Sequence, residues 1–173
     1  MNITEIIGTF PEYAKDTKLN YSKILNEGIL ENNILYSIIL IASLASKNEI
    51  LEKAAYEEVK EHLSSEYLED VKGAYSVMSM NAIYYRFTHL ATDYNYSAMP
   101  ANLRMQYLSK HSVSKTEFEM LCLSVAVLMG CGKCINAHEV VLRENNVSNV
   151  KIQAVARISS ILNSIANILR IEN

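Results

Sequence analysis

The sequence predicts an all-α fold, and three observations carry that prediction. Five glycines and two prolines occur in 173 residues, too few for the many turns of an all-β domain. The apolar residues recur mostly at spacings of three and four, which is the period of a buried helix face. The pattern Ser114-x-x-Glu117 is a capping box and marks a helix start near Lys115. The length fits one compact multi-helix domain over residues 1–173.

The first half of the chain contains the following predicted elements. Residues 33–45 are apolar on nearly all sides and predict a buried helix. Residues 49–63 place apolar and charged side chains on opposite faces, as a surface helix does. Residues 67–92 predict one long helix or two short ones, and residues 93–100, which are polar and end in proline, predict a loop.

The second half continues the helical pattern. Residues 101–109 predict a short helix, and the capping box then begins a longer one. The two glycines in residues 130–132 indicate a break after that helix. A further helix is expected over residues 134–144, where two asparagines follow. Residues 149–171 carry a strong apolar stripe, which predicts a core helix that can also contribute to a subunit contact.

A faint internal similarity links the two halves. Residues 35–43 align without gaps onto residues 121–129, and the positions opposite Cys131 and Cys134 are then not cysteines. Two apolar helices often align this well by chance. The alternative is a duplicated helical unit whose first copy lacks the chemistry.

Charge and hydropathy exclude several kinds of partner. The chain has 16 basic and 19 acidic residues, a net charge of −3, which gives no electrostatic attraction for nucleic acid or an anionic membrane. The longest uninterrupted apolar runs, such as residues 38–45, are too short to cross a bilayer. The first residues lack the basic start and apolar run of a signal peptide. We expect a cytoplasmic protein that binds neither nucleic acid nor a membrane.

The chemistry of the chain is concentrated in Cys131-Gly132-Lys133-Cys134, with His138 four residues further on. In a reducing compartment such a cysteine pair indicates redox or metal chemistry. On a helix the cysteines and the histidine would share one face, with His138 one turn from Cys134. Cys131 would lie at the helix N-terminus, where free N–H groups and the dipole favour a thiolate. Taken alone, that position favours Cys131 as the attacking thiol.

Other interpretations of the same residues stay open at this point. Cys131, Cys134 and His138 are all zinc ligands, and His111 is the nearest candidate for a fourth. The cysteine pair can also arise by chance. Cys122 lies in an apolar stretch and is expected to be a buried hydrophobic residue.

The residues around the pair resemble a known family. Glu119, then eleven residues, then Cys131-x-x-Cys134 and, after three more, His138 is similar to the active-site signature of the alkyl hydroperoxidase D (AhpD) family, within the carboxymuconolactone decarboxylase-like superfamily. By itself Glu119 would be interpreted as a solvated acid near a helix N-terminus. Further similarity extends over residues 100–105 and 140–143, and weakly into the first half.

The resemblance implies an AhpD-like fold of two related helical lobes, over about residues 1–95 and 100–173, often assembled as a homotrimer. It implies an antioxidant, lipoyl-dependent peroxidase that reduces organic hydroperoxides and a partner peroxiredoxin, AhpC. Electrons would come from lipoamide on a dihydrolipoamide acyltransferase, which NADH recharges through dihydrolipoamide dehydrogenase. The chain has no dinucleotide-binding motif, so we expect no bound cofactor.

The resemblance also assigns roles to single residues. Cys131 and Cys134 are the redox disulfide pair: Cys134 forms the sulfenic acid, and Cys131 is the proton donor and resolving thiol. Glu119 and His138 form a proton relay to the thiols. The resemblance thus makes Cys134 the attacking thiol, whereas the helix N-terminus alone favoured Cys131. His138 lies one helical turn from Cys134, which gives the assignment to Cys134 a physical basis. Many members have histidine where this chain has Lys133, a difference that bears on catalytic efficiency.

Three rival functions belong to other classes. A disulfide-relay adaptor to a peroxiredoxin would need both cysteines but little peroxidase activity of its own. A decarboxylase or isomerase of the wider superfamily would not need two vicinal thiols. A zinc-stabilised structural protein would contain stoichiometric metal.

Overall fold

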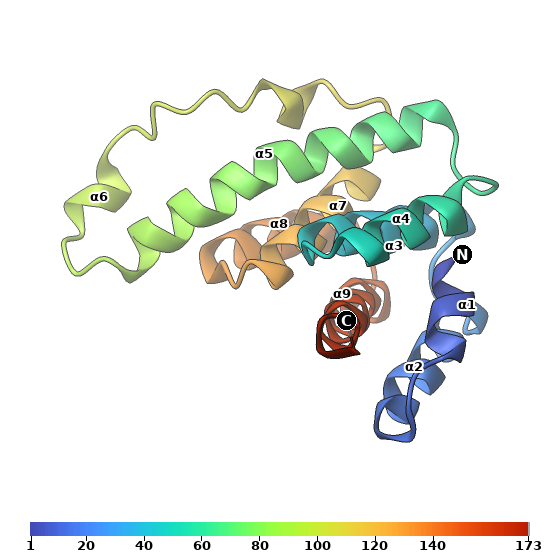
Figure 1. Cartoon of the computed structure of the whole chain (residues 1–173). Coiled ribbons are helices and arrows are strands. Elements are labelled where there is room, and N and C mark those ends of the chain that lie inside the picture. The colour runs from blue at the N-terminus through green and yellow to red at the C-terminus, as the bar shows by residue number, and fades with distance from the viewer. Residues whose placement is uncertain (173) are drawn as a thin grey trace.

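A computed structural model of the chain describes residues 1–172, and within them it contains helices and no strand. The all-α prediction is confirmed (Figure 1). The helices are α1 (Ile3–Gly8), α2 (Lys15–Asn26), α3 (Asn32–Ala45), α4 (Glu49–Val59), α5 (Ser65–Leu90), α6 (Asn95–Ala98), α7 (Lys115–Leu128), α8 (Gly132–Glu144) and α9 (Asn149–Glu172), with 3₁₀ turns at Glu12–Ala14 and Gln106–Ser109.

Helix α3 is the centre of the core. It contacts α4, α5, α7 and α9, and its side chains from Ile38 to Ala42 are fully buried. A helix that is apolar all round has no face to offer to water, so neighbours cover it on every side. The prediction of a buried helix here is confirmed. Helices α3 and α7 lie in contact, while the duplication and the two-lobe division stay predictions.

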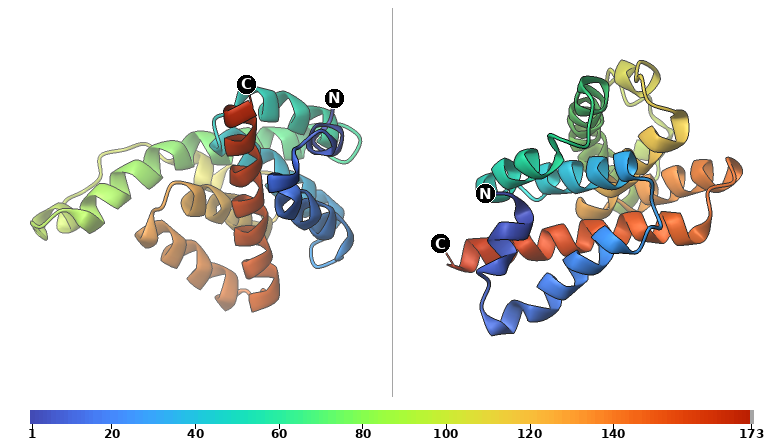
Figure 2. Two further views of the ribbon diagram at one scale, coloured as in Figure 1. Left: turned by 60° about the horizontal axis from the view of Figure 1, so that its bottom comes forward. Right: turned by 90° about the vertical axis from the view of Figure 1, so that its right-hand side faces the viewer.

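The N-terminal helices were not predicted. Helix α1 begins with a reciprocal capping box, in which Asn2 Oδ1 accepts from the Glu5 amide and the Glu5 side chain accepts from the Asn2 amide. That signal is visible in the sequence. Helix α2 packs along α9 (Figure 2). Together α1 and α2 cover the side of the core away from α5 (Figure 1).

Helix α5 is one continuous helix of 26 residues, the first of the two alternatives for residues 67–92. Its C-terminal end and α6 extend beyond the other helices (Figure 1). The chain then returns along α5 through residues 99–114, here called the return segment (Figure 1). This return places residues distant in sequence beside the middle of α5.

Three boundaries differ from the predictions. The helix expected over 49–63 ends at Val59, and the loop expected over 93–100 contains the single turn α6. The helix expected over 101–109 is wrong: only the 3₁₀ turn Gln106–Ser109 forms there. The Tyr107 hydroxyl, inside that 3₁₀ turn, instead makes a long-range hydrogen bond to Asp70 on α5.

Helix α9 is the one helix among residues 1–172 that is long and apolar enough to cross a membrane by length and composition. Half of its most apolar window is buried inside the fold. Its buried side chains, such as Val155, Leu162 and Ile165, face the α3 and α7 side of the core. The core helix of a soluble protein passes the same test, so this feature is weak evidence for a membrane span.

Candidate active site

The turn between α7 and α8 sets the position of Cys131. Gly130 has φ +64°, a conformation that glycine adopts without strain. The Cys131 amide donates to Ala126 O at 3.1 Å and the Gly130 amide to Val127 O at 3.1 Å. This pair of bonds is a Schellman motif, which ends α7 and turns the chain. Cys131 is then the N-cap residue of α8, as the sequence predicted.

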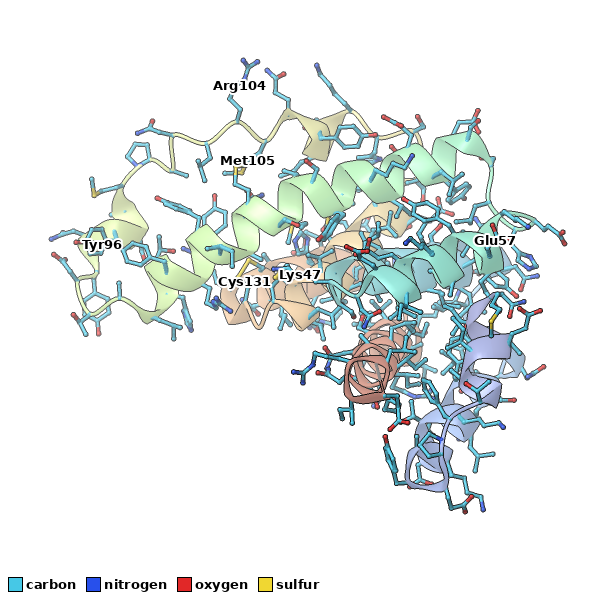
Figure 3. The ribbon with its side chains drawn as sticks, in the orientation of Figure 1. Lys47, Glu57, Tyr96, Arg104, Met105 and Cys131 are labelled. Atoms are coloured by element: carbon cyan, nitrogen blue, oxygen red, sulfur yellow. A yellow bond between two sulfur atoms is a disulfide. The ribbon has the colours of Figure 1, made fainter. Side chains whose placement is uncertain are left out.

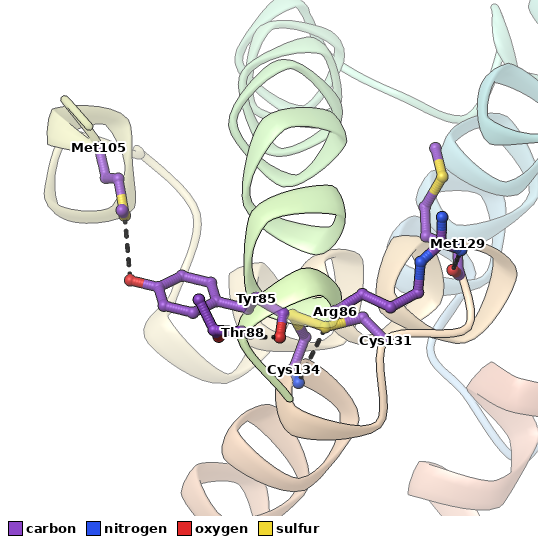
Figure 4. Close-up of a disulfide and its surroundings, with 7 residues drawn as sticks. All are labelled: Tyr85, Arg86, Thr88, Met105, Met129, Cys131 and Cys134. Atoms are coloured by element: carbon purple, nitrogen blue, oxygen red, sulfur yellow. Dashed lines mark hydrogen bonds between the residues drawn. A yellow bond between two sulfur atoms is a disulfide. The ribbon is translucent and has the colours of Figure 1, made fainter. Parts of the chain in front are cut away.

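The two cysteines are brought together as a disulfide. Cys131 and Cys134 are bonded, with Cα atoms 5.2 Å apart. The Cys134 amide also donates to Cys131 Sγ at 3.2 Å (Figure 4). Cys131 is completely buried, while Cys134 is 5% exposed. Figure 3 shows Cys131 just beneath α5. Of the two cysteines, Cys134 is therefore the less buried.

Glu119 and His138 meet across the α7–α8 pair. His138 Nδ1 lies 2.6 Å from Glu119 Oε2, and the two side chains are 15% and 19% exposed. Glu119 is therefore not the solvated acid that its sequence position alone suggested. A carboxylate bonded to Nδ1 holds the imidazole in one orientation and directs Nε2 toward other partners. Cys134 and His138 line the same pocket.

That pocket is a mostly apolar cavity of about 320 Å³ between α5, α8 and the return segment. Cys134 and His138 supply its reactive groups, and Cys131 does not line it. Of the two cysteines, Cys134 is therefore the one that faces the apolar cavity. Its main apolar walls are Met78 and Tyr85 from α5, Met105 and Leu108 from the return segment, and Ala137 from α8.

Two cations of the site have defined positions. Lys133 also lines the pocket, and its Nζ lies 5.4 Å from the centroid of the Tyr85 ring, a cation–π contact. Arg86 Nη1 donates to Met129 O at 2.7 Å (Figure 4). That bond ties α5 to the turn that precedes Cys131.

The remaining candidate residues lie apart from this chemistry. Cys122 is a free cysteine and fully buried, as predicted, and burial raises the pKa of its thiol, with the Glu119 charge acting in the same direction. His111 Nδ1 lies 2.8 Å from Val113 O, and its ring stacks on Phe118. Among residues 1–172, no three His, Cys, Asp or Glu side chains gather as a metal-binding group.

The apolar wall was missed by sequence reasoning. Residues Met78 and Tyr85 stand on one face of α5, and their pattern is that of any buried helix. Met105 and Leu108 reach the pocket only because the return segment crosses α5. The family resemblance in the first half of the chain includes residues 81–86, and that similarity was the available signal for this wall.

The all-helical fold and the buried Cys-x-x-Cys pair beside a paired histidine and glutamate define the class: an all-α protein with a dithiol–disulfide site. Comparisons with known proteins agree with this class. A family model described as the carboxymuconolactone decarboxylase family matches residues 95–171. A protein of Solibacter usitatus named alkyl hydroperoxide reductase AhpD is 40% identical over 172 residues, covering 99% of this chain and 97% of the relative.

Two further relatives carry the same name. The protein of Acidobacterium capsulatum is 39% identical over 173 residues, covering 99% of this chain and 94% of the relative. That of Koribacter versatilis is 41% identical over 167 residues, covering 96% of this chain and 86% of the relative. The chain belongs to the AhpD family, and the resemblance seen in the sequence is confirmed.

Proposed function

We propose that the chain is an antioxidant, thiol-dependent alkyl hydroperoxide reductase that uses Cys131 and Cys134 as its redox pair. The observation that carries the proposal is the apolar pocket lined by Cys134 and His138. Its walls suit an alkyl group, and its reactive end offers a thiol and an imidazole. The names of the relatives support the same activity.

The first half-reaction begins on the reduced protein. His138, oriented by Glu119, accepts the Cys134 proton. The thiolate attacks the terminal oxygen of the hydroperoxide, so that an S–O bond forms as the O–O bond breaks. The alkoxide leaves and takes a proton from His138, giving an alcohol and a Cys134 sulfenic acid. The peroxide is thereby reduced by two electrons and the sulfur oxidised by two.

The second half-reaction restores the dithiol. The Cys131 thiol attacks the Cys134 sulfur, forms the disulfide and releases water. In the disulfide the two Cα atoms are 5.2 Å apart, within the usual range for such a bond. A dihydrolipoyl group then reduces the disulfide by exchange through a mixed disulfide.

The partners follow from the same proposal. Lipoamide on an acyltransferase component donates the electrons, and dihydrolipoamide dehydrogenase recharges it from NADH. The reduced pair also regenerates the peroxiredoxin AhpC. The protein works in the cytoplasm as a homotrimer, and it binds no nucleic acid and no membrane. The rival function is a disulfide-relay adaptor to the peroxiredoxin, with little peroxidase activity of its own.

Peroxide-dependent NADH oxidation tests this function. Purified lipoamide and dihydrolipoamide dehydrogenase are supplied, and the wild type is compared with Cys134→Ser, with and without a peroxiredoxin. We expect turnover by the wild type alone and none by Cys134→Ser, because that substitution removes the attacking sulfur. Turnover only with the peroxiredoxin would instead establish the adaptor, and full activity of Cys134→Ser would rule out the scheme.

A further inference from the structure

Asn81 is a pocket residue whose polar group has no role in the scheme above and whose oxygen lacks a partner among the described residues. It lies on α5 between Met78 and Tyr85, and it lines the pocket that holds Cys134 and His138. Its side chain is 4% exposed, and Oδ1 is buried without a hydrogen-bond partner among residues 1–172. A buried polar atom without a partner lowers stability unless something else satisfies it.

The side chains of the pocket wall indicate what kind of ligand would satisfy Asn81 Oδ1. Most of the wall is apolar, so a suitable ligand carries an alkyl or aryl group. Asn81 Oδ1 is an acceptor, so a ligand that satisfies it also carries a donor hydrogen. An organic hydroperoxide has both features, since its terminal oxygen carries a hydrogen and its other end is carbon.

We infer that Asn81 binds the hydroperoxide group, accepting the O–H of the terminal oxygen and holding that oxygen toward Cys134 Sγ. This inference rests on the proposed function. Cys134 attack then transfers the terminal oxygen to sulfur with its hydrogen still attached, while the alkoxide takes its proton from His138. The hydrogen bond to Asn81 therefore persists from the bound peroxide to the sulfenic acid, and no proton passes through the amide.

The chain offers a matched control on the same helix. Ser79 Oγ is also buried without a partner among the described residues, but Ser79 does not line the pocket. If an unpartnered polar group on α5 were only a local defect, Asn81→Leu and Ser79→Ala would behave alike. If Asn81 binds substrate, only Asn81→Leu changes the reaction with peroxide.

The experiment is single-turnover oxidation of the reduced protein by cumene hydroperoxide and by tert-butyl hydroperoxide, followed by loss of free thiol. For Asn81→Leu we expect the second-order rate constant to fall about tenfold. The fall should be the same for both peroxides, because Asn81 contacts the group they share. Reduction of the disulfide by dihydrolipoamide should be unchanged, and the melting temperature should be equal or higher. Asn81→Ala provides a second variant in case leucine does not pack.

Three outcomes separate the claims. A slower reaction in both Asn81 variants, with Ser79→Ala like the wild type, supports the inference. Asn81 variants within twofold of the wild type overturn it and leave the proposed function standing. A wild type that reacts no faster than a free dithiol overturns the proposed function and the inference with it.

Discussion

The hydrogen bond between His138 Nδ1 and Glu119 Oε2, at 2.6 Å, is the contact on which proton transfer at Cys134 depends in this scheme. It joins helices α7 and α8, and both side chains are mostly buried. A carboxylate in this position fixes the orientation of the ring. The two residues are therefore expected to act as one unit.

Removing either partner should slow the reaction without unfolding the helices. We expect His138→Phe to lower kcat about 100-fold, the usual contribution of a positioned general base, and Glu119→Phe to lower it as well. Glu139→Gln is the matched control, because Glu139 pairs with Arg143 on the outer side of the same helix. The variants are compared by their steady-state peroxidase rates, with circular dichroism to check folding. If both variants matched the wild type, Glu119 and His138 would not form a proton relay.

At the scale of elements, the return segment closes one side of the pocket and is attached to α5 through Asp70. Asp70 is buried, and its carboxylate accepts from Ser112 N at 2.7 Å, Val113 N at 2.8 Å and the Tyr107 hydroxyl at 3.0 Å. The Tyr107 ring occupies the space that a side chain on Gly73 would fill. These contacts hold Met105 and Leu108 over Cys134.

The Tyr107 bond should give stability a pH dependence at high pH. Burial first, and then the bond to Asp70, raise the pKa of Tyr107 from 10.0 to about 12. Because the folded pKa is the higher one, the stabilisation is complete below about pH 10 and is lost as pH rises toward 12. Tyr107→Phe should lower the free energy of unfolding by about 1 kcal/mol at neutral pH, and the difference should vanish near pH 12.

Denaturant unfolding of the wild type and Tyr107→Phe across this range measures the effect. Tyr94→Phe is the control, since the Tyr94 side chain is 89% exposed and should show no such dependence. A constant difference between wild type and Tyr107→Phe at all pH values would contradict the account.

The elements that the sequence predicted well are those fixed by local chemistry. The capping box at Ser114 and Glu117 and the glycine at residue 130 give α7 its observed bounds, both confirmed. The helix expected over residues 101–109 failed because contacts with α5, which no local pattern encodes, hold the return segment: the Tyr107 hydroxyl and the Ser112 amide both bond to Asp70. The Glu119 to His138 contact could be expected only from the family resemblance, since periodicity made Glu119 a surface acid.

At the scale of the whole molecule, the projecting end of α5 and α6 carries a group of exposed apolar side chains. Ile83, Phe87 and Leu90 share one face of α5 and are 49%, 51% and 71% exposed. Met99, just after α6, is 59% exposed. Apolar residues gathered in this way usually meet another surface. The homotrimer proposed above offers a second copy of the chain as that surface.

The assembly can be tested on this face. We expect sedimentation of the wild type as a trimer, and of the double variant Phe87→Lys and Leu90→Lys as a monomer, because charges there would be buried in a subunit contact. Leu19→Lys, on α2, is the control with a similarly exposed leucine. A wild-type monomer, or a trimer that persists in the double variant, would show that this face serves another purpose.

The central claim is that Cys134 is the sulfur that attacks the peroxide, and trapping its sulfenic acid tests it most directly. In Cys131→Ser the resolving thiol is absent, so one equivalent of cumene hydroperoxide should leave a sulfenic acid that dimedone labels. Peptide mass spectrometry should then find the label on Cys134, with none on the buried Cys122. An unlabelled Cys134 in this variant, together with a labelled Cys131 in Cys134→Ser, would contradict the account.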